Sequence, residues 1–178
     1  MRTVYIARMN TEFSRPIKAA HIRGTPLSYE LEADAQTRAA LAERFSLPAI
    51  AALSGVFVLK HERSGIIAAD LTMRARVTQL CVVTLEPFET EIEERVALHF
   101  VPAARLEDEE ELAPESLEGP DEIPYEDDVI DLGEALAEQL ALALDPYPRK
   151  PGAELPAEAS DDGANPFGAL KGKLGKLS

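Results

Sequence analysis

The sequence predicts an α+β fold in which a curved antiparallel β-sheet, meander-like or barrel-like, packs with about two helices. Two observations lead to this prediction. Consecutive segments alternate apolar and polar residues, and two other segments repeat apolar residues every three or four positions. A chain of 178 residues, 46% of them apolar, can bury one core but has little room for a second. We therefore expect a single domain over residues 1–150 and a flexible tail over residues 151–178.

Three candidate strands follow one another in the middle of the chain. Residues 49–63 and 65–80 are separated only by turn-forming residues, which indicates a hairpin. Residues 88–102 repeat the alternation, with a possible shift of phase near Glu94. Residues 1–30 contain prolines and a glycine that suit edge strands and turns. The second strand divides into a core face with Leu71, Met73, Ala75 and Val77 and an outer face with Thr72, Arg74, Arg76 and Thr78.

Two segments have the spacing of helices. Asp34 can cap a helix that ends before the next proline, and in it Leu41 and Phe45 share one face. A second helix follows Asp131, which can form a capping-box-like pair with Glu134 at the third helical position. Three prolines end this helix. Its apolar stripe has a spacing of four and consists of Leu132, Leu136, Leu140 and Leu144.

The net charge of -14 is distributed unevenly along the chain. Residues 1–85 carry a net charge of +4, residues 86–138 carry -18, and residues 139–178 balance. Residues 103–128 combine the run EDEEE with three prolines and few large apolar residues, which is typical of a disordered acidic loop. Such a polyanion can engage a basic protein, for example a ribosomal protein. The alternative is a loop that only keeps the protein in solution.

The residue pattern indicates no catalytic centre, and we expect no cofactor, no metal and no small-molecule substrate. Cys81 is the only cysteine and has no histidine near it in the sequence, so a buried structural thiol is the expected role. The three histidines lie far apart, which disfavours a zinc site, and no phosphate-binding glycine loop is present. No apolar run approaches the roughly 20 residues of a membrane-spanning helix, so we expect a cytoplasmic protein without membrane contact.

One face of the second strand is a candidate RNA-binding surface. Arg74 and Arg76 project from the same side at a spacing comparable with that of RNA phosphates. Arg15, Lys18 and Arg23 could join them if the amino-terminal segment lies alongside. The strip lacks aromatic side chains for base stacking, so any contact with RNA would involve the backbone. The alternative is an ordinary solvated sheet face.

Four pieces of the sequence, taken in order, resemble one family. They are CVVTLEPFETEIEERVALHFVP, the acidic loop, DVIDLGEALAEQLALALDPYPRKPGA and NPFGALKGKL. Over about residues 70–178 they are similar to the YceD-like proteins, a bacterial and plastid family associated with accumulation of large-subunit ribosomal RNA. The resemblance implies a non-enzymatic accessory role in making the large subunit. Its partner would be precursor ribosomal RNA or a ribosomal protein of that subunit.

The resemblance also implies candidate partner-binding positions. Leu85 and Leu132 look like core residues, whereas the Pro-Phe pair of the tail has no evident core to serve and is expected to dock on a partner. The full set is Leu85, Glu86, Pro87 and Phe88 in the turn, Asp131, Leu132, Glu138 and Gln139 around the last helix, and Asn165, Pro166 and Phe167 in the tail.

Many relatives carry Cys-x-x-Cys-Leu-x-Pro in the turn, and some have a second cysteine pair beyond the last helix, an arrangement that suits zinc. Here Thr84 takes the place of the second cysteine, and the segment PYPRKPGA contains none. We therefore expect the turn to be held by packing of Leu85 and Phe88 and by the rigid Pro87. Two other functions stay open: an acidic adaptor for basic partners unrelated to ribosomes, and an enzyme with an unrecognised site.

Overall fold

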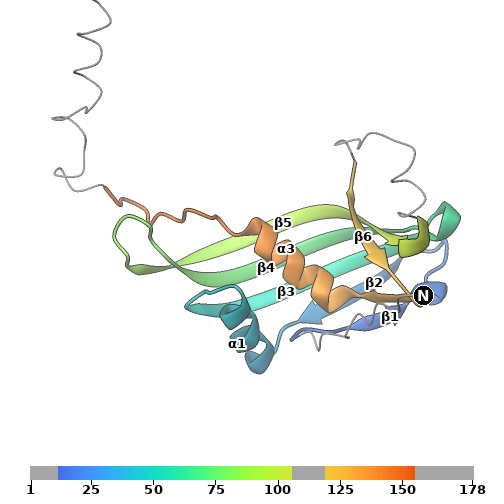
Figure 1. The fold of residues 1–178 in the computed structure, drawn as a ribbon, viewed down its shortest axis with the longest axis horizontal. Helices are drawn as coiled ribbons and strands as arrows, with labels where there is room; N and C mark the ends of the chain where they lie inside the picture. The colour runs from blue at the N-terminus through green and yellow to red at the C-terminus, as the bar shows by residue number, and fades with distance from the viewer. Residues whose placement is uncertain (1–11, 106–118, 155–178) are drawn as a thin grey trace, which may run out of the picture.

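The computed structural model describes residues 12–105 and 119–154. Figure 1 shows a broad sheet with helix α3 lying across one side of it and helix α1 near one end. In chain order the elements are β1 (Pro16–Lys18), the 3-10 helix η1 (Ala19–His21), β2 (Leu27–Glu32), α1 (Ala35–Arg44), β3 (Ala49–His61), the 3-10 turn η2 (Arg63–Gly65), β4 (Ile67–Leu80), β5 (Pro87–Pro102), β6 (Asp121–Tyr125), β7 (Val129–Asp131) and α3 (Leu132–Ala143).

The main sheet has the strand order β2-β3-β4-β5-β6. Its neighbouring pairs are antiparallel, except that β6 runs parallel to β5. Strands β1 and β7 form a separate antiparallel pair beside α3. The α+β prediction is therefore confirmed. The sheet stays open, since β2 and β6 stand at the two ends of the order, so the barrel-like description applies only loosely.

The core lies between the inner face of the sheet and α3. The predicted stripe of leucines on α3 is confirmed: Leu132, Leu136 and Leu140 are buried, and Leu144 is partly buried. Close approach of the helix to the sheet depends on Gly55 of β3. A β-carbon at that position would lie 2.8 Å from a methyl carbon of Leu136. The glycine thus makes room for a leucine side chain over the centre of the sheet.

The predicted hairpin of β3 and β4 is confirmed, as is the alternation of β4. The turn between these strands needs left-handed backbone conformations, and Ser64 and Gly65 have φ angles of 62° and 79°. The expected shift of phase near Glu94 is wrong, because β5 pairs with β4 in one uninterrupted register from Pro87 to Phe100. The irregularity lies in β3 instead, between Ile50 and Ala52.

The segment expected as a disordered loop over residues 103–128 contains a strand. Strand β6 forms near its carboxyl end, where Ile123 and Tyr125 are partly buried against the core. The hydroxyl of Tyr125 donates a hydrogen bond of 2.7 Å to the carbonyl of Gly65 and so ties β6 to the turn between β3 and β4. Pro124 is tolerated because β6 is an edge strand. The run EDEEE lies outside the described residues.

Both predicted helix starts are confirmed. The carboxylate of Asp34 accepts a hydrogen bond of 2.8 Å from the backbone of Thr37 and caps α1. Asp131 caps α3 in the same way, through the backbone N–H groups of Gly133 and Glu134. Within the described part of the chain, neither helix is long and apolar enough to cross a membrane.

We predict that Gly133→Ala destabilises the fold, because an added β-carbon would overlap the backbone carbonyl of Phe13. Overpacking against rigid backbone is expected to lower the free energy of unfolding by about 1–3 kcal/mol. Denaturant unfolding of the variant measures the loss. Gly24→Ala is the matched control, since a β-carbon at Gly24 meets no atom within 4 Å. Equal stability of the two variants would contradict the prediction.

Candidate partner-binding surfaces

The two sides of the sheet differ because helix α3 covers the inner side, while strands β2 to β5 present alternate residues on the outer side. Charges of both signs lie on this outer face, with acidic residues in excess. The cationic residues are Lys60, Arg74, Arg76 and Arg95, and the acidic residues are Glu30, Glu32, Asp70, Glu89, Glu91 and Glu93.

Arg74 and Arg76 project from the same outer face, as the alternation of β4 predicts. Each has an acidic neighbour directly across on β5: Arg74 stands opposite Glu93, and Arg76 stands opposite Glu91. The guanidinium of Arg74 forms an ion pair of 3.1 Å with the carboxylate of Glu93. Because both side chains are exposed, this pair contributes only about 0–1 kcal/mol. Its main effect is that the glutamates lower the positive potential that an RNA phosphate would meet at this strip.

The amino-terminal cations do not extend this strip. Arg15 and Lys18 lie at β1, which pairs with β7 beside α3, and therefore sit on the inner side of the sheet. The ammonium of Lys18 donates to the backbone carbonyl of Asp127 at 3.1 Å. Arg23 accepts a backbone hydrogen bond from His61 at the far end of β3. At about 3.3 Å per residue, that end of β3 lies roughly 20 Å from the part of the strand next to Arg74.

An acidic groove lies on the inner side of the molecule, between β6, β7 and the start of α3. It has a volume of about 530 Å³. The partly buried Ile123, Tyr125 and Val129 form its accessible apolar lining, which we call its floor, and Phe100, Ile130 and Ala135 of the same lining are buried. Among the described residues that line it, none is a lysine, arginine or histidine. The acidic residues of this lining are Glu122, Glu126, Asp127, Asp131, Glu134 and Glu138. We call this surface the acidic groove.

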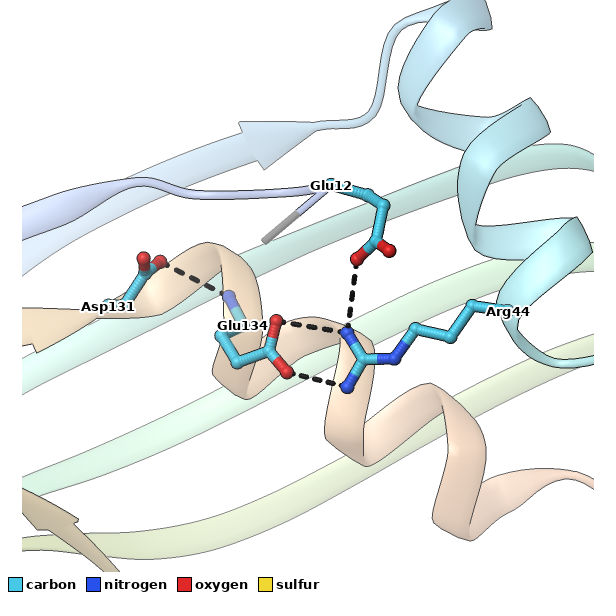
Figure 2. Close-up of polar contacts among 4 residues, drawn as sticks. All are labelled: Glu12, Arg44, Asp131 and Glu134. Atoms are coloured by element: carbon cyan, nitrogen blue, oxygen red, sulfur yellow. Dashed lines mark hydrogen bonds and ion pairs between the residues drawn. The ribbon is translucent and has the colours of Figure 1, made fainter. Parts of the chain in front are cut away.

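Two of these carboxylates are occupied by structural contacts. Asp131 accepts hydrogen bonds from the hydroxyl of Ser14 and the backbone N–H of Arg15, in addition to those that cap α3. Glu134 does not complete the expected capping box. As Figure 2 shows, its carboxylate turns toward Arg44 of α1 and accepts hydrogen bonds of 2.6 and 3.1 Å from the two terminal nitrogens of that side chain.

Arg44 links three segments through its guanidinium. It also forms an ion pair of 3.5 Å with Glu12, which precedes β1 (Figure 2). The hydrogen bond to Glu134 raises the pKa of Arg44 above its usual value. Sequence reasoning missed Arg44. A cation in the last turn of a helix interacts favourably with the helix dipole, so the position of Arg44 in α1 has a local explanation. Nothing in the sequence indicates the distant Glu134 as its partner.

The four remaining acidic residues of the groove, Glu122, Glu126, Asp127 and Glu138, are exposed. Partial desolvation raises the pKa of Glu138, and the neighbouring carboxylate of Glu134 raises it further. The ionised form of Glu138 is therefore destabilised in the folded protein. Sequence reasoning placed Glu122 and Glu126 in a disordered loop. The alternating Ile123 and Tyr125 were the signal for a strand.

The other family-motif positions divide between structural and surface roles. Leu132 is buried, as expected, and so is Gln139. Leu85 is 76% exposed, which contradicts its assignment to the core. Its φ angle of 59° places its backbone in the left-handed region within the turn between β4 and β5. The tail positions Asn165, Pro166 and Phe167 lie outside the described residues.

Hydrogen bonds close the turn between β4 and β5, in place of the expected packing of Leu85. The backbone N–H of Leu85 donates to the carbonyl of Cys81, and the N–H of Cys81 donates to the carbonyl of Glu86. The segment that follows α3 packs against this turn. Val82 donates to the carbonyl of Pro148 at 2.9 Å, and Lys150 forms an ion pair of 2.9 Å with Glu86.

The turn and the segment after α3 therefore meet where some relatives would bring two cysteine pairs together. The residues present do not fit zinc. Cys81 supplies one sulfur, Thr84 a hydroxyl, and the segment after α3 contributes Lys150. Among residues 12–105 and 119–154, no group of three or more histidine, cysteine and carboxylate side chains is placed to hold a metal.

Cys81 is buried, as predicted, and its sulfur accepts a hydrogen bond of 3.4 Å from the backbone of Thr84. Hydrogen bonding by the Thr84 side chain is the main cause that lowers the pKa of the Cys81 thiol, from 9.0 to about 7. Backbone N–H groups of Lys150 and Thr84 act in the same direction, against the effect of burial. The fold thus favours the thiolate.

We predict that Cys81 contributes stability that depends on pH. Because the pKa is lowered in the fold, the contribution is present above the unfolded value of 9.0 and is lost as the pH falls through about 7. The difference in Tm between the wild type and Cys81→Ser should therefore grow from pH 7 to pH 9. Thermal unfolding of both proteins under reducing conditions measures it. A constant difference across this range would show that thiol ionisation makes no contribution.

Comparison with known proteins and protein families identifies the family of this chain. No curated protein and no solved structure matches the chain. The model of one family matches residues 69–171, which is more than half of the chain. These residues include Arg74, Arg76, the turn after β4 and every residue that lines the acidic groove. The chain therefore belongs to the family described as large ribosomal RNA subunit accumulation protein YceD.

Proposed function

We propose that this protein is a non-enzymatic accessory factor in biogenesis of the large ribosomal subunit. In this proposal it acts in the cytoplasm and supports accumulation of large-subunit ribosomal RNA by binding a basic protein of that subunit. The family description supports a role in the accumulation of this RNA, and it names no reaction. Membership of this family also favours a ribosomal partner over an adaptor function unrelated to ribosomes.

The distribution of charge supports a protein partner over direct contact with RNA. Binding to RNA depends on cations that replace the counterions of the phosphates. The outer face of the sheet sets Arg74 and Arg76 opposite glutamates, and the groove on the inner side is lined by carboxylates. Ribosomal proteins expose lysine-rich and arginine-rich segments until they bind RNA. An acidic surface can hold such a segment and keep it from binding RNA at the wrong place.

The first test measures the proposed role in the cell. Depletion of the protein should lower large-subunit ribosomal RNA relative to small-subunit ribosomal RNA and reduce the large-subunit peak in a sucrose gradient. Quantification of both RNAs after depletion, with the wild-type protein expressed again as a control, measures the effect. An unchanged ratio would refute the proposed function.

The second test separates a protein partner from RNA. We predict that Arg74→Glu combined with Arg76→Glu restores the ribosomal RNA ratio in depleted cells as well as the wild type does. The reason is that these arginines face glutamates across the sheet rather than forming a cationic surface. Both side chains are exposed, so the variant is expected to fold, and its Tm provides the check. Failure to restore the ratio at an unchanged Tm would instead favour RNA contact through this strip.

A further inference from the structure

We propose that the acidic groove is the binding site for a short peptide segment in which lysine or arginine residues flank an apolar residue. This inference rests on the proposed function, since it names the surface by which a basic partner would be held. It commits to a protein segment as occupant. A nucleic acid, which presents phosphates, is the occupant that the test must exclude.

The shape of the groove supports a small peptide segment. Its volume of about 530 Å³ falls within the range of about 300–1,000 Å³ that is usual for ligand pockets. The apolar surface open to an occupant comes from the partly buried Ile123 and Tyr125 on β6 and Val129 on β7, whereas Phe100 and Ala135 are buried. One apolar side chain of an occupant can lie on this floor and exclude water from it, which the hydrophobic effect favours.

The charges around the floor are complementary to lysine and arginine. Asp131 and Glu134 are held by backbone groups and by Arg44, so their role is to position α3 and the groove wall. Glu126 and Asp127 follow β6, and Glu138 comes from the opposite wall on α3. The side chain of Glu122 alternates with that of Ile123 and lies on the other face of β6. Acidic residues thus lie on both sides of the floor and are complementary to cations that flank an apolar residue.

The environment of Glu138 favours a bound cation. Partial burial and the adjacent Glu134 raise its pKa in the protein alone, and the charge of Arg44, which lowers it, offsets them only in part, so the charge of Glu138 is destabilising in the absence of an occupant. A lysine or arginine placed beside it would offset both effects. For the same reason Glu138→Gln should not lower the stability of the fold, and binding and folding can be tested separately.

The test is a titration of the full chain with three fluorescent probes at about 150 mM salt, where long-range attraction between charges is screened. The first probe is the peptide Lys-Lys-Val-Lys-Lys, blocked at both ends. The second replaces its valine with serine and keeps the charge. The third is a single-stranded RNA of 12 nucleotides. We expect the first peptide to bind more tightly than the second, and both to bind more tightly than the RNA.

A charge-matched pair of variants locates the site. The groove variant combines Glu126→Gln, Asp127→Asn and Glu138→Gln. The control combines Glu30→Gln, Glu89→Gln and Glu91→Gln, which removes the same charge from exposed residues on the outer face. The groove variant should weaken binding of the first peptide about tenfold, and the control less than twofold, at an unchanged Tm.

Several outcomes would overturn the inference. They are equal weakening by the two variants, equal affinity for the valine and serine peptides, tighter binding of the RNA, and no peptide binding. None of these outcomes tests the proposed function, which is tested separately by the ribosomal RNA ratio after depletion.

The groove variant also connects the groove with the proposed function in cells. In depleted cells it should fail to restore the ribosomal RNA ratio, while the control variant restores it. Full restoration by the groove variant would refute the groove but keep the proposed function.

Discussion

The carboxylate of Asp131 is the contact on which the arrangement of the inner side depends. It caps α3, and it also accepts hydrogen bonds from Ser14 and Arg15 at the start of β1. One side chain thus joins the amino-terminal segment to the last helix, across more than one hundred residues of sequence. Gly133 allows this approach, because any larger residue would collide with Phe13. Loss of a helix cap alone costs about 0.5–2 kcal/mol, and here the same carboxylate also orders β1.

The acidic groove follows from that arrangement. With α3 fixed at its first turn and pressed onto the sheet over Gly55, its next turn presents Glu138 toward β6. The ion pair of Arg44 with Glu134 neutralises one wall carboxylate and ties α1 to α3. Desolvation and repulsion among carboxylates make such a surface costly to keep in a folded protein. A cost of this kind is typical of binding surfaces, where local stability is given up for interaction with a partner.

The end of the molecule around Cys81 shows how a fold can keep a junction without a metal. Two segments that lie more than sixty residues apart meet there through the pair of Glu86 with Lys150 and through backbone hydrogen bonds. Those contacts are weaker than metal ligation, because exposed ion pairs contribute only about 0–1 kcal/mol. Leu85 in this turn adopts a left-handed conformation, which adds strain, and its apolar side chain is exposed.

The sequence by itself determined the α+β class, the hairpin of β3 and β4, the alternation of β4 and the caps Asp34 and Asp131, because each depends on residues close together in the chain. Motif order also identified the family, and the distribution of charge along the chain located its acidic middle. The tertiary structure alone decided that β6 forms within a polar segment, since Ile123 and Tyr125 become buried only against distant residues. It alone decided that Arg74 faces Glu93, because strand register brings them together. The acidic groove likewise assembles carboxylates from β6, β7 and α3, and no local pattern in the sequence specifies how those elements pack.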